Sequence, residues 1–197
     1  MNEKPYQYDV VVYIGRFEPY HTGHHALVHH ALALGGQVVL VLGSAGEMRS
    51  RKNPFYAAER EAMIAGSMAG TDAQRLLFAA VPDFHDNAAW VEAVQMAVSM
   101  KAPGATRIAL LGHFKDESSY YLNHFPAWQL ESVERANALD ATTVRNVMFD
   151  QDRPLEDRIA QLKGMVPAGA LAVIETWMAS EAFLALADGQ AKQAISA

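Results

Sequence analysis

The sequence predicts an α/β fold in which a doubly wound parallel sheet is covered by helices on both faces. Strand-like and helix-like segments alternate along the chain, the first two strand-like segments are continuous apolar runs, and polar loops follow the strands. Continuous apolar runs are typical of strands that are buried on both faces. Repeated β-α-β order implies parallel strands joined by right-handed crossovers.

The individual elements follow from hydrophobic spacing and from glycine and proline positions. Strands are expected at residues 10–15, 38–43, 76–81, 107–111 and 128–133. Helices are expected at residues 23–34, 57–68, 87–100 and 142–147, and again from residue 155 onward, with Pro167 and Gly169 marking a turn. Gly35 and Gly36 should close the first helix, because glycine readily takes the left-handed conformation that ends helices.

The chain is expected to form a single domain over residues 1–197, with a core at residues 9–150 and a helical extension at residues 151–197. No internal repeat or linker demands a second domain. In open parallel sheets, ligands bind beyond the carboxyl ends of the strands. The polar loops after Ile14, Leu42, Val81 and Leu111 should therefore meet at one edge of the sheet.

Composition limits the class of protein. Hydrophobic residues make up 51% of the chain and charged residues 19%, which favours a substantial core over disorder. The net charge of −6 argues against sequence-independent nucleic-acid binding, which needs a broad basic face. The absence of cysteine excludes disulfides, thiolate metal sites and cysteine nucleophiles. With neither a signal peptide nor a long apolar run, the chain is expected to be cytoplasmic, with no membrane partner.

The most informative segment is GRFEPYHTGH, residues 15–24, which joins the first strand to the first helix. A strand, a tight turn and a helix N-terminus can hold a phosphate against backbone N–H groups and the helix dipole. His21 and His24 can add directed donors, although histidines at a helix start can also be ordinary residues. The dinucleotide fingerprint GxGxxG and the Walker sequence are both absent.

This segment closely resembles the signature of the nucleotidyltransferases with an HxGH motif, which have a Rossmann-like fold. The resemblance implies that His21 and His24 are catalytic: they bind the ATP triphosphate and stabilise charge as the α-phosphate is attacked. It also places Gly15, Arg16, Phe17 and Gly23 in the ATP site.

Three further histidines lie in the same helix. His25 and His29 are four residues apart and can share a helix face, as zinc-binding pairs do. No third ligand lies nearby in the sequence, so His25, His29 and His30 are interpreted as residues of a solvated helix face rather than a metal site.

The second loop concentrates the cations Arg49, Arg51 and Lys52 where the second strand ends, which favours anion binding over a merely solvated charge cluster. The following NPFxxxER segment, residues 53–60, resembles nicotinamide-nucleotide adenylyltransferases of the archaeal type and bacterial enzymes that fuse such a domain to a Nudix hydrolase. That resemblance places Lys52 near the phosphates as a catalytic cation and Phe55 in the mononucleotide site. Where the family commonly has arginine, Lys52 keeps the charge but loses the bidentate fork.

The third loop and the start of the next helix contain Asn87 and Trp90. By resemblance they belong to the mononucleotide pocket, where an indole face packs on the cationic pyridine ring. The alternative is that Trp90 is an aromatic residue of the helix core. Gly112 and His113, after the fourth strand, should lie by the ATP nucleoside.

A fourth motif lies at residues 142–145. Thr142, Thr143 and Arg145 match the family's phosphate-binding helix start, where threonine caps the helix and arginine reaches the same anion. Asp140 and Ala141 depart from the family's pattern. A carboxylate near a triphosphate is unfavourable unless it points away or meets magnesium.

The resemblance implies that ATP and nicotinamide mononucleotide react to give NAD and pyrophosphate. Magnesium (Mg2+) is expected on the ATP phosphates, with no metal ligands from the protein itself. The Nudix box is missing, so no pyrophosphohydrolase activity is expected. The alternatives are a cytidylyltransferase, a pantetheine-phosphate or flavin adenylyltransferase, or a silent nucleotide sensor, which the Asp140 and Ala141 departures favour. The sequence leaves nicotinamide versus nicotinate open, and a homo-oligomer is expected.

Overall fold

The computed structural model describes residues 6–112, 123–133 and 139–189. The chain divides into two compact units, which are considered separately. Unit 1 consists of Met1–Arg16, Gly23–Gly46 and Ala69–Ala138, and unit 2 of Phe17–Thr22, Glu47–Met68 and Leu139–Ala197. The single domain expected from the sequence stays a prediction.

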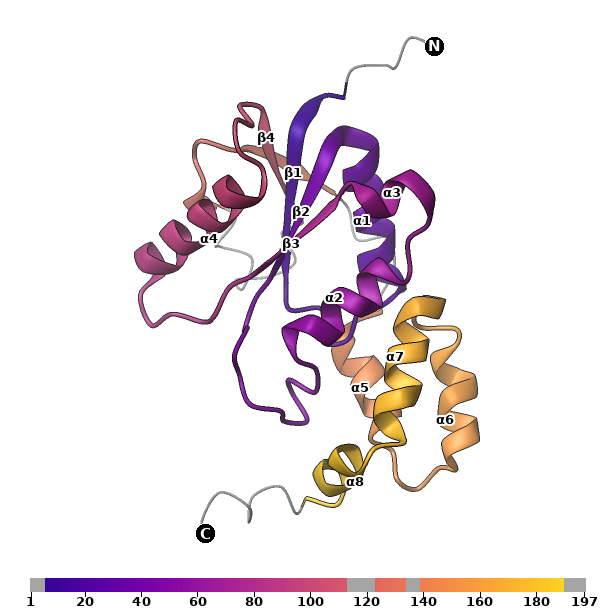
Figure 1. Cartoon of the computed structure of the whole chain (residues 1–197). Coiled ribbons are helices and arrows are strands. Elements are labelled where there is room, and N and C mark those ends of the chain that lie inside the picture. The colour runs from indigo at the N-terminus through magenta and orange to yellow at the C-terminus, as the bar shows by residue number, and fades with distance from the viewer. Residues whose placement is uncertain (1–5, 113–122, 134–138, 190–197) are drawn as a thin grey trace. The chain divides into compact units, whose positions relative to one another are not determined.

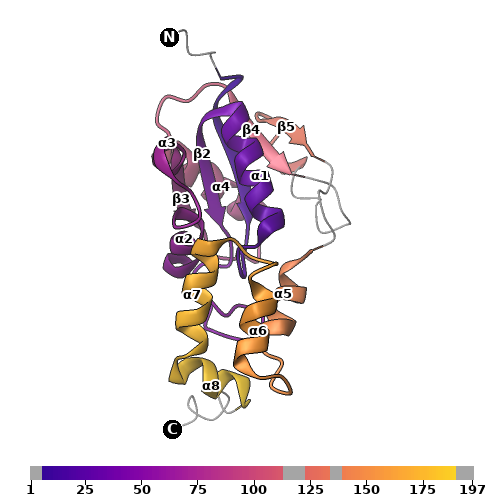
Figure 2. The ribbon, with the colours of Figure 1, turned by 90° about the vertical axis from the view of Figure 1, so that its right-hand side faces the viewer.

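Unit 1 contains a five-stranded sheet in the order β3-β2-β1-β4-β5, with every neighbouring pair parallel. The strands are β1 (Tyr8–Gly15), β2 (Gly35–Leu42), β3 (Leu76–Ala80), β4 (Ile108–Gly112) and β5 (Gln129–Ser132). The helices are α1 (Thr22–Leu34), α3 (Gly70–Gln74) and α4 (Asn87–Lys101), and α1 and α4 lie on opposite faces of the sheet (Figures 1 and 2). This confirms the predicted doubly wound α/β fold.

Both faces of the central strands are buried, as their continuous apolar runs predicted. In β1, Val10, Val12 and Ile14 form a core cluster with Val94 and Val98 of α4. Residues that point to the other face, such as Val11 and Tyr13, are buried as well, as are Val28, Ala31 and Leu32 of α1. Two covered faces are what parallel β-α-β units require.

Gly35 and Gly36 correct one detail of the sequence analysis. The first helix does end at Leu34, but neither glycine has a positive φ, and both already belong to β2. A Cβ atom on Gly35 would lie 2.7 Å from Cγ2 of Val11. Glycine is therefore needed here for the close approach of β2 to β1 rather than for a helix cap.

Unit 2 is helical, with α2 (Ala57–Ala65), α5 (Ala141–Met148), α6 (Leu155–Leu162), α7 (Ala168–Met178) and α8 (Glu181–Ala187). Its aromatic core joins Phe55, Phe149, Trp177 and Phe183, whose ring centroids lie 4.8–6.0 Å apart in the contacting pairs. Gly169 was expected in a turn but lies inside α7, where an added Cβ would be 2.2 Å from the carbonyl carbon of Gly66.

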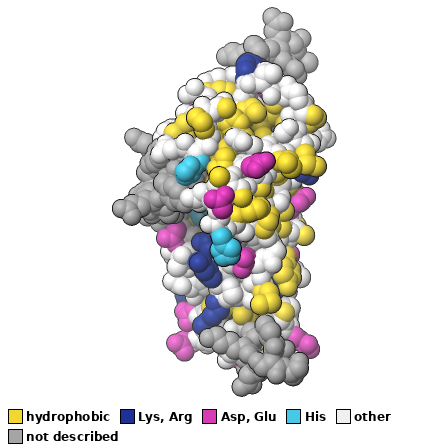
Figure 3. All heavy atoms as spheres, turned by 90° about the vertical axis from the view of Figure 1, so that its left-hand side faces the viewer, with side chains coloured by type: hydrophobic (Ala, Val, Ile, Leu, Met, Phe, Trp, Pro, Cys, Tyr) yellow, Lys and Arg dark blue, Asp and Glu magenta, His cyan; other side chains and the backbone are white. Residues whose placement is uncertain are grey.

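The surface and the helix lengths add two facts. Met96 and Met100 of α4 are exposed, and on the face in Figure 3 individual acidic, basic and histidine side chains are scattered among larger areas of hydrophobic side chains. Among the described residues no single helix is long and apolar enough to cross a membrane; by length and composition alone, α7 and α8 qualify only when taken together, across a bend of 79°.

Candidate active site

The carboxyl edge of the sheet in unit 1 presents backbone at two adjacent strand ends. β1 ends at Gly15 and its neighbour β4 ends at Gly112, and the Gly43 N–H donates to the Gly15 carbonyl at 3.0 Å. Arg16 follows directly and lies beside Gly43. The predicted ATP residues Gly15, Arg16 and Gly112 are thus brought together, whereas His113 lies outside the described residues.

The two motif histidines take different positions at the start of α1. His21 directly precedes the helix and is only 5% exposed. His24 is in the first turn, half-buried, with its ring 6.4 Å from that of Tyr13, and Gly23 precedes it. No acidic residue occupies that turn, which suits an anion at the positive end of the helix dipole, and the N–H of Thr22, the first helical residue, donates to the carbonyl of Met165 at 3.0 Å.

Phe17 lies in the turn before α1 with a positive φ of 54°. Its side chain is 1% exposed and packs near Tyr20, with the ring centroids 6.2 Å apart. A nucleotide contact by Phe17 would therefore involve its backbone.

The other histidines of α1 form a pair. The Nε2 atoms of His25 and His29 lie 3.1 Å apart, with the rings perpendicular. Burial, and secondly the neighbouring charge of His29, lower the pKa of His25. His29 and His30 are exposed. Among the residues that the structure describes, no group of three or more histidine, aspartate or glutamate side chains could hold a metal ion.

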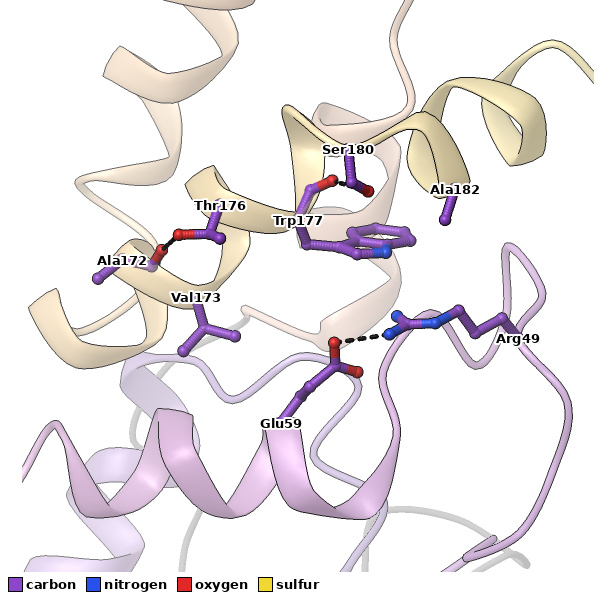
Figure 4. A pocket seen from close by; sticks show the side chains of 8 residues that line it. All are labelled: Arg49, Glu59, Ala172, Val173, Thr176, Trp177, Ser180 and Ala182. Atoms are coloured by element: carbon purple, nitrogen blue, oxygen red, sulfur yellow. Dashed lines mark hydrogen bonds and ion pairs between the residues drawn. The ribbon is translucent and has the colours of Figure 1, made fainter.

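Two of the three cations in the second loop are used within unit 2. Arg49 pairs with Glu59 at 2.6 Å, donates to the Pro54 carbonyl at 2.5 Å, and stacks 4.2 Å from the ring centroid of Tyr56. Beside it, a cavity of about 600 Å³ is lined by Arg49, Glu59, Ala172, Val173, Thr176, Trp177, Ser180 and Ala182 (Figure 4).

Arg51 and Lys52 are both exposed, and the guanidinium of Arg51 lies 4.9 Å from the ring centroid of Phe149. Lys52 is therefore a candidate to meet an anionic ligand.

Phe55 is not exposed as a pocket aromatic would be. Its side chain is 3% exposed and packs on Trp177, with the ring centroids 4.8 Å apart. Its N–H donates to Oε2 of Glu18 at 3.1 Å, and Glu18 also forms an ion pair with Arg60. The sequence analysis gave no role to Arg60, although it is a fixed position of the NPFxxxER segment, and it missed Glu18, because Glu18 occupies a variable position of the HxGH signature and reveals its role only through these contacts.

At the start of α5, Asp140 is the helix cap. Its Oδ1 accepts the N–H of Thr143 at 2.8 Å and the Thr143 hydroxyl at 3.0 Å. The Arg145 guanidinium donates to the hydroxyl of Thr142 at 3.0 Å and to the carbonyl of Glu18 at 2.6 Å. The Asp140 carboxylate, which was expected to be unfavourable beside a triphosphate, is therefore hydrogen-bonded to Thr143. The side chains of Thr142 and Arg145 are hydrogen-bonded to each other.

The mononucleotide residues of unit 1 lie in the first turn of α4. Asn87 is the first helical residue and is exposed, and Asp86 caps the helix by accepting the N–H of Ala89 at 2.8 Å. Trp90 is half-buried and meets Phe125 edge-on at 5.8 Å, and Phe125 stacks on Trp128 at 4.6 Å. Trp90 thus packs against the core and still keeps exposed surface. Phe125 and Trp128 were missed, because neither lies in a recognisable motif.

Comparisons with known proteins identify the family. The cytidylyltransferase-like family matches residues 12–80. A nicotinamide/nicotinic acid mononucleotide adenylyltransferase of Acinetobacter baylyi is 35% identical over 179 residues, 90% of this chain and 91% of that protein. A nicotinamide-nucleotide adenylyltransferase of Halobacterium salinarum is 40% identical over 71% of this chain and 75% of that protein.

Solved structures show the same fold. Two crystal structures of a bifunctional NMN adenylyltransferase/ADP ribose pyrophosphatase from Francisella tularensis match 94% of this chain, with TM-scores of 0.79 and 0.81 and identities of 25% and 26%. The chain spans only 53% and 54% of those proteins, about half their length. One of the two was determined in complex with AMP and a manganese ion.

Proposed function

The chain belongs to the family of nicotinamide-nucleotide adenylyltransferases, and from this premise we propose that it joins nicotinamide mononucleotide to the adenylyl group of ATP. An oxygen of the mononucleotide phosphate attacks the α-phosphorus of ATP in line. The bond between that phosphorus and the oxygen bridging the α- and β-phosphates breaks, and the products are NAD and pyrophosphate. The attacking phosphate has a second pKa near 6 and is largely dianionic at neutral pH, so no strong general base is needed.

The observation that supports this proposal is the kind of side chain that each unit supplies. His24 in the first turn of α1 in unit 1, and buried His21 and the Arg145 guanidinium, which is bonded to Thr142, in unit 2, are groups that stabilise negative charge rather than remove a proton. Lys52, exposed in the second loop, is assigned as a fourth catalytic cation.

The remaining site residues bind rather than react. We assign Gly15, Arg16, Gly23, Gly112, His113, Thr142 and Thr143 to ATP, together with the backbone of Phe17. Asn87 and Trp90 are assigned to the mononucleotide, with the exposed part of the indole against the pyridine ring. Buried Phe55 supports that pocket through packing rather than by direct stacking.

The site suits a divalent cation carried by the substrate. Among the described residues there is no cluster of metal-ligating side chains, and Asp140 is engaged with Thr143. Magnesium binds ATP with few protein ligands, and it would neutralise charge on the leaving phosphates. We assign Mg2+ to the ATP phosphates.

Other transferases with the HxGH motif are the second candidates. The Asn53–Arg60 segment and Trp90 favour the nicotinamide family over them. The capping role of Asp140 accounts for one of the two departures that favoured a silent sensor, and Ala141 is the other. We further propose that the protein is cytoplasmic, forms a homo-oligomer and has no pyrophosphohydrolase activity. Light scattering tests the oligomeric state, and an ADP-ribose hydrolysis assay tests the absence of pyrophosphohydrolase activity.

The experiment is incubation with Mg·ATP and either nicotinamide or nicotinate mononucleotide, with chromatographic detection of dinucleotide and pyrophosphate. His24→Ala should lose roughly 10²–10³-fold in turnover while staying folded, as expected for one lost charge-stabilising donor. His30→Ala is the matched control, because His30 is an exposed residue of the same helix. Near-normal turnover in His24→Ala would refute the assignment of His24 as a charge-stabilising residue of an adenylyltransferase.

A further inference from the structure

A fully buried ion pair lies in unit 2. Glu18 is 2% exposed and Arg60 is 1% exposed, and Nε of Arg60 lies 3.2 Å from Oε1 of Glu18. Glu18 lies in the turn before α1, and Arg60 belongs to α2. Burying both charges of an ion pair costs more desolvation free energy than forming a pair at the surface. Replacing a buried pair by apolar side chains is often neutral or stabilising. Stability alone therefore does not account for this pair.

The contacts of Glu18 join three segments of unit 2. Its carboxylate meets Arg60 through Oε1 and accepts the N–H of Phe55 through Oε2 at 3.1 Å. Its main-chain carbonyl accepts Nη1 of Arg145 at 2.6 Å. One residue thus fixes the turn before α1, the loop before α2 and the guanidinium on α5.

Arg145 is held on two sides by these contacts. Nη1 is bound to the carbonyl of Glu18 and Nη2 to the hydroxyl of Thr142. A guanidinium directs its donors in a fixed plane, so the position of the Glu18 carbonyl sets the direction in which the other donors point. The carbonyl is in turn fixed by the buried side chain of the same residue.

We propose that Glu18 and Arg60 are a positioning pair: their buried ion pair fixes the Glu18 carbonyl, and this carbonyl orients Arg145 for the transferred phosphate. Neither residue touches substrate. The inference rests on the proposed function, since it needs Arg145 to act on the triphosphate. A misplacement by about 1 Å can cost on the order of 10²-fold in rate, which sets the scale of the effect.

A double-mutant cycle tests the pair. Glu18→Gln keeps the shape and the acceptor for the Phe55 N–H but removes the charge that Arg60 requires. At a temperature well below unfolding, we expect kcat to fall at least ~10-fold in the wild-type background with a smaller change in KM for ATP. In the Arg145→Ala background the same change should cost less than ~2-fold, because the residue through which Glu18 acts is gone.

A merely structural role gives a different result. The melting temperature would then fall equally in both backgrounds, and the two losses in kcat would multiply instead of overlapping; that outcome overturns the proposal. Glu59→Gln is the matched control. Glu59 directly precedes Arg60 and also forms an ion pair, with Arg49, but its side chain is partly exposed. Glu59→Gln should leave kcat unchanged.

Two further arms keep the test decisive. If Glu18→Gln does not fold, Arg60→Lys retains the charge but loses the Nε contact, and the same cycle applies. ATP affinity measured by calorimetry runs in parallel. Absence of NAD formation by the wild type would refute the proposed function, whereas equal fold-losses in kcat from Glu18→Gln with and without Arg145 would refute the positioning role alone.

Discussion

The residues of the candidate site separate into those that bind charge and those that hold the binders in place. The sequence predicted Arg49 as an anion-binding cation, but its guanidinium donates to the Pro54 carbonyl and to the Glu59 carboxylate within unit 2. Lys52, three positions along, is exposed. Charge in a loop therefore indicates where anions can bind only after the internal partners of each cation are known.

Lys52 offers a direct test of this distinction. Lys52→Ala should reduce kcat/KM about 10-fold or more without changing the melting temperature, because an exposed cation near a phosphate contributes to binding charge and not to the core. Lys52→Arg should retain activity, since it restores the family's guanidinium. Steady-state kinetics and thermal melts on the three proteins check this, and an unchanged kcat/KM in Lys52→Ala would remove Lys52 from the site.

Asp140 gives a stability prediction at the same scale. Asp140→Ala should destabilise the protein by about 1 kcal/mol, the usual cost of a lost N-cap. Asp140→Asn keeps a good cap and should stay close to the wild type. Urea unfolding monitored by circular dichroism measures both. A loss in Asp140→Asn as large as that in Asp140→Ala would show that the carboxylate charge matters rather than the cap.

The sequence predicted these site residues unevenly, for physical reasons. Motif positions such as His24 and Arg145 could be proposed because residue type and spacing define them. Glu18 was missed because its role depends on contacts with residues 37 or more positions away along the chain. Asp140 is a different case, because its capping partner Thr143 is only three positions away; Asp140 was interpreted as a charge near phosphate, and its capping role was overlooked.

Among the elements, strand positions were more predictable than glycine roles. The strand expected at residues 10–15 is confirmed because a buried parallel strand has a distinctive apolar run, and β1 extends it only to Tyr8. The five-residue helix α3 was missed, since so short a segment has little periodicity. Gly35 and Gly169 were interpreted as helix or turn signals, whereas packing against Val11 and Gly66 requires them.

The contact between α2 and α7 can be tested at Gly169. Gly169→Ala places a methyl group 2.2 Å from a backbone atom of Gly66, so the two helices must separate. We expect a loss of about 3 kcal/mol in the free energy of unfolding, the upper part of the range for overpacking. Gly164→Ala is the control, because its new Cβ would meet its nearest neighbour at an ordinary 3.6 Å. Denaturant unfolding compares the two, and equal losses would contradict the close-contact explanation.

The start of β1 gives a pH prediction. The Asp9 carboxylate accepts the backbone N–H groups of Thr106 and Arg107 and pairs with the Arg107 guanidinium at 2.6 Å. These contacts, led by the backbone N–H of Arg107, hold the pKa of Asp9 well below its usual range.

Because the folded pKa is lowered, the stabilisation by Asp9 is present above the unfolded pKa of about 3.9 and is lost as pH falls toward the folded value. Asp9→Asn should therefore be less stable than the wild type at pH 7, and the difference should shrink as the pH falls below about 4. Melting temperatures measured from pH 7 to pH 2.5 decide this. A difference that stays constant over that range would contradict the assigned role of the charge.

At the scale of the whole molecule, the connectivity of the two units bears on the predicted single domain. The chain passes from one unit to the other after residues 16, 22, 46, 68 and 138, so neither unit is a contiguous stretch of sequence. Domains that fold independently are usually joined where few connections cross. Two units sharing so many crossings cannot readily unfold one at a time, and this favours one cooperative domain.

Calorimetry tests that cooperativity and the nucleotide site together. We expect one thermal transition whose calorimetric and van't Hoff enthalpies agree, because each crossing ties the folding of one unit to that of the other. Mg·ATP at about 100 times its Kd should stabilise the native state by about 2.7 kcal/mol and move that single transition upward as a whole. His24→Ala should show the same single transition with a smaller shift. Two separate transitions, or a nucleotide shift confined to part of the unfolding enthalpy, would show that the units unfold independently and that the single-domain prediction is wrong.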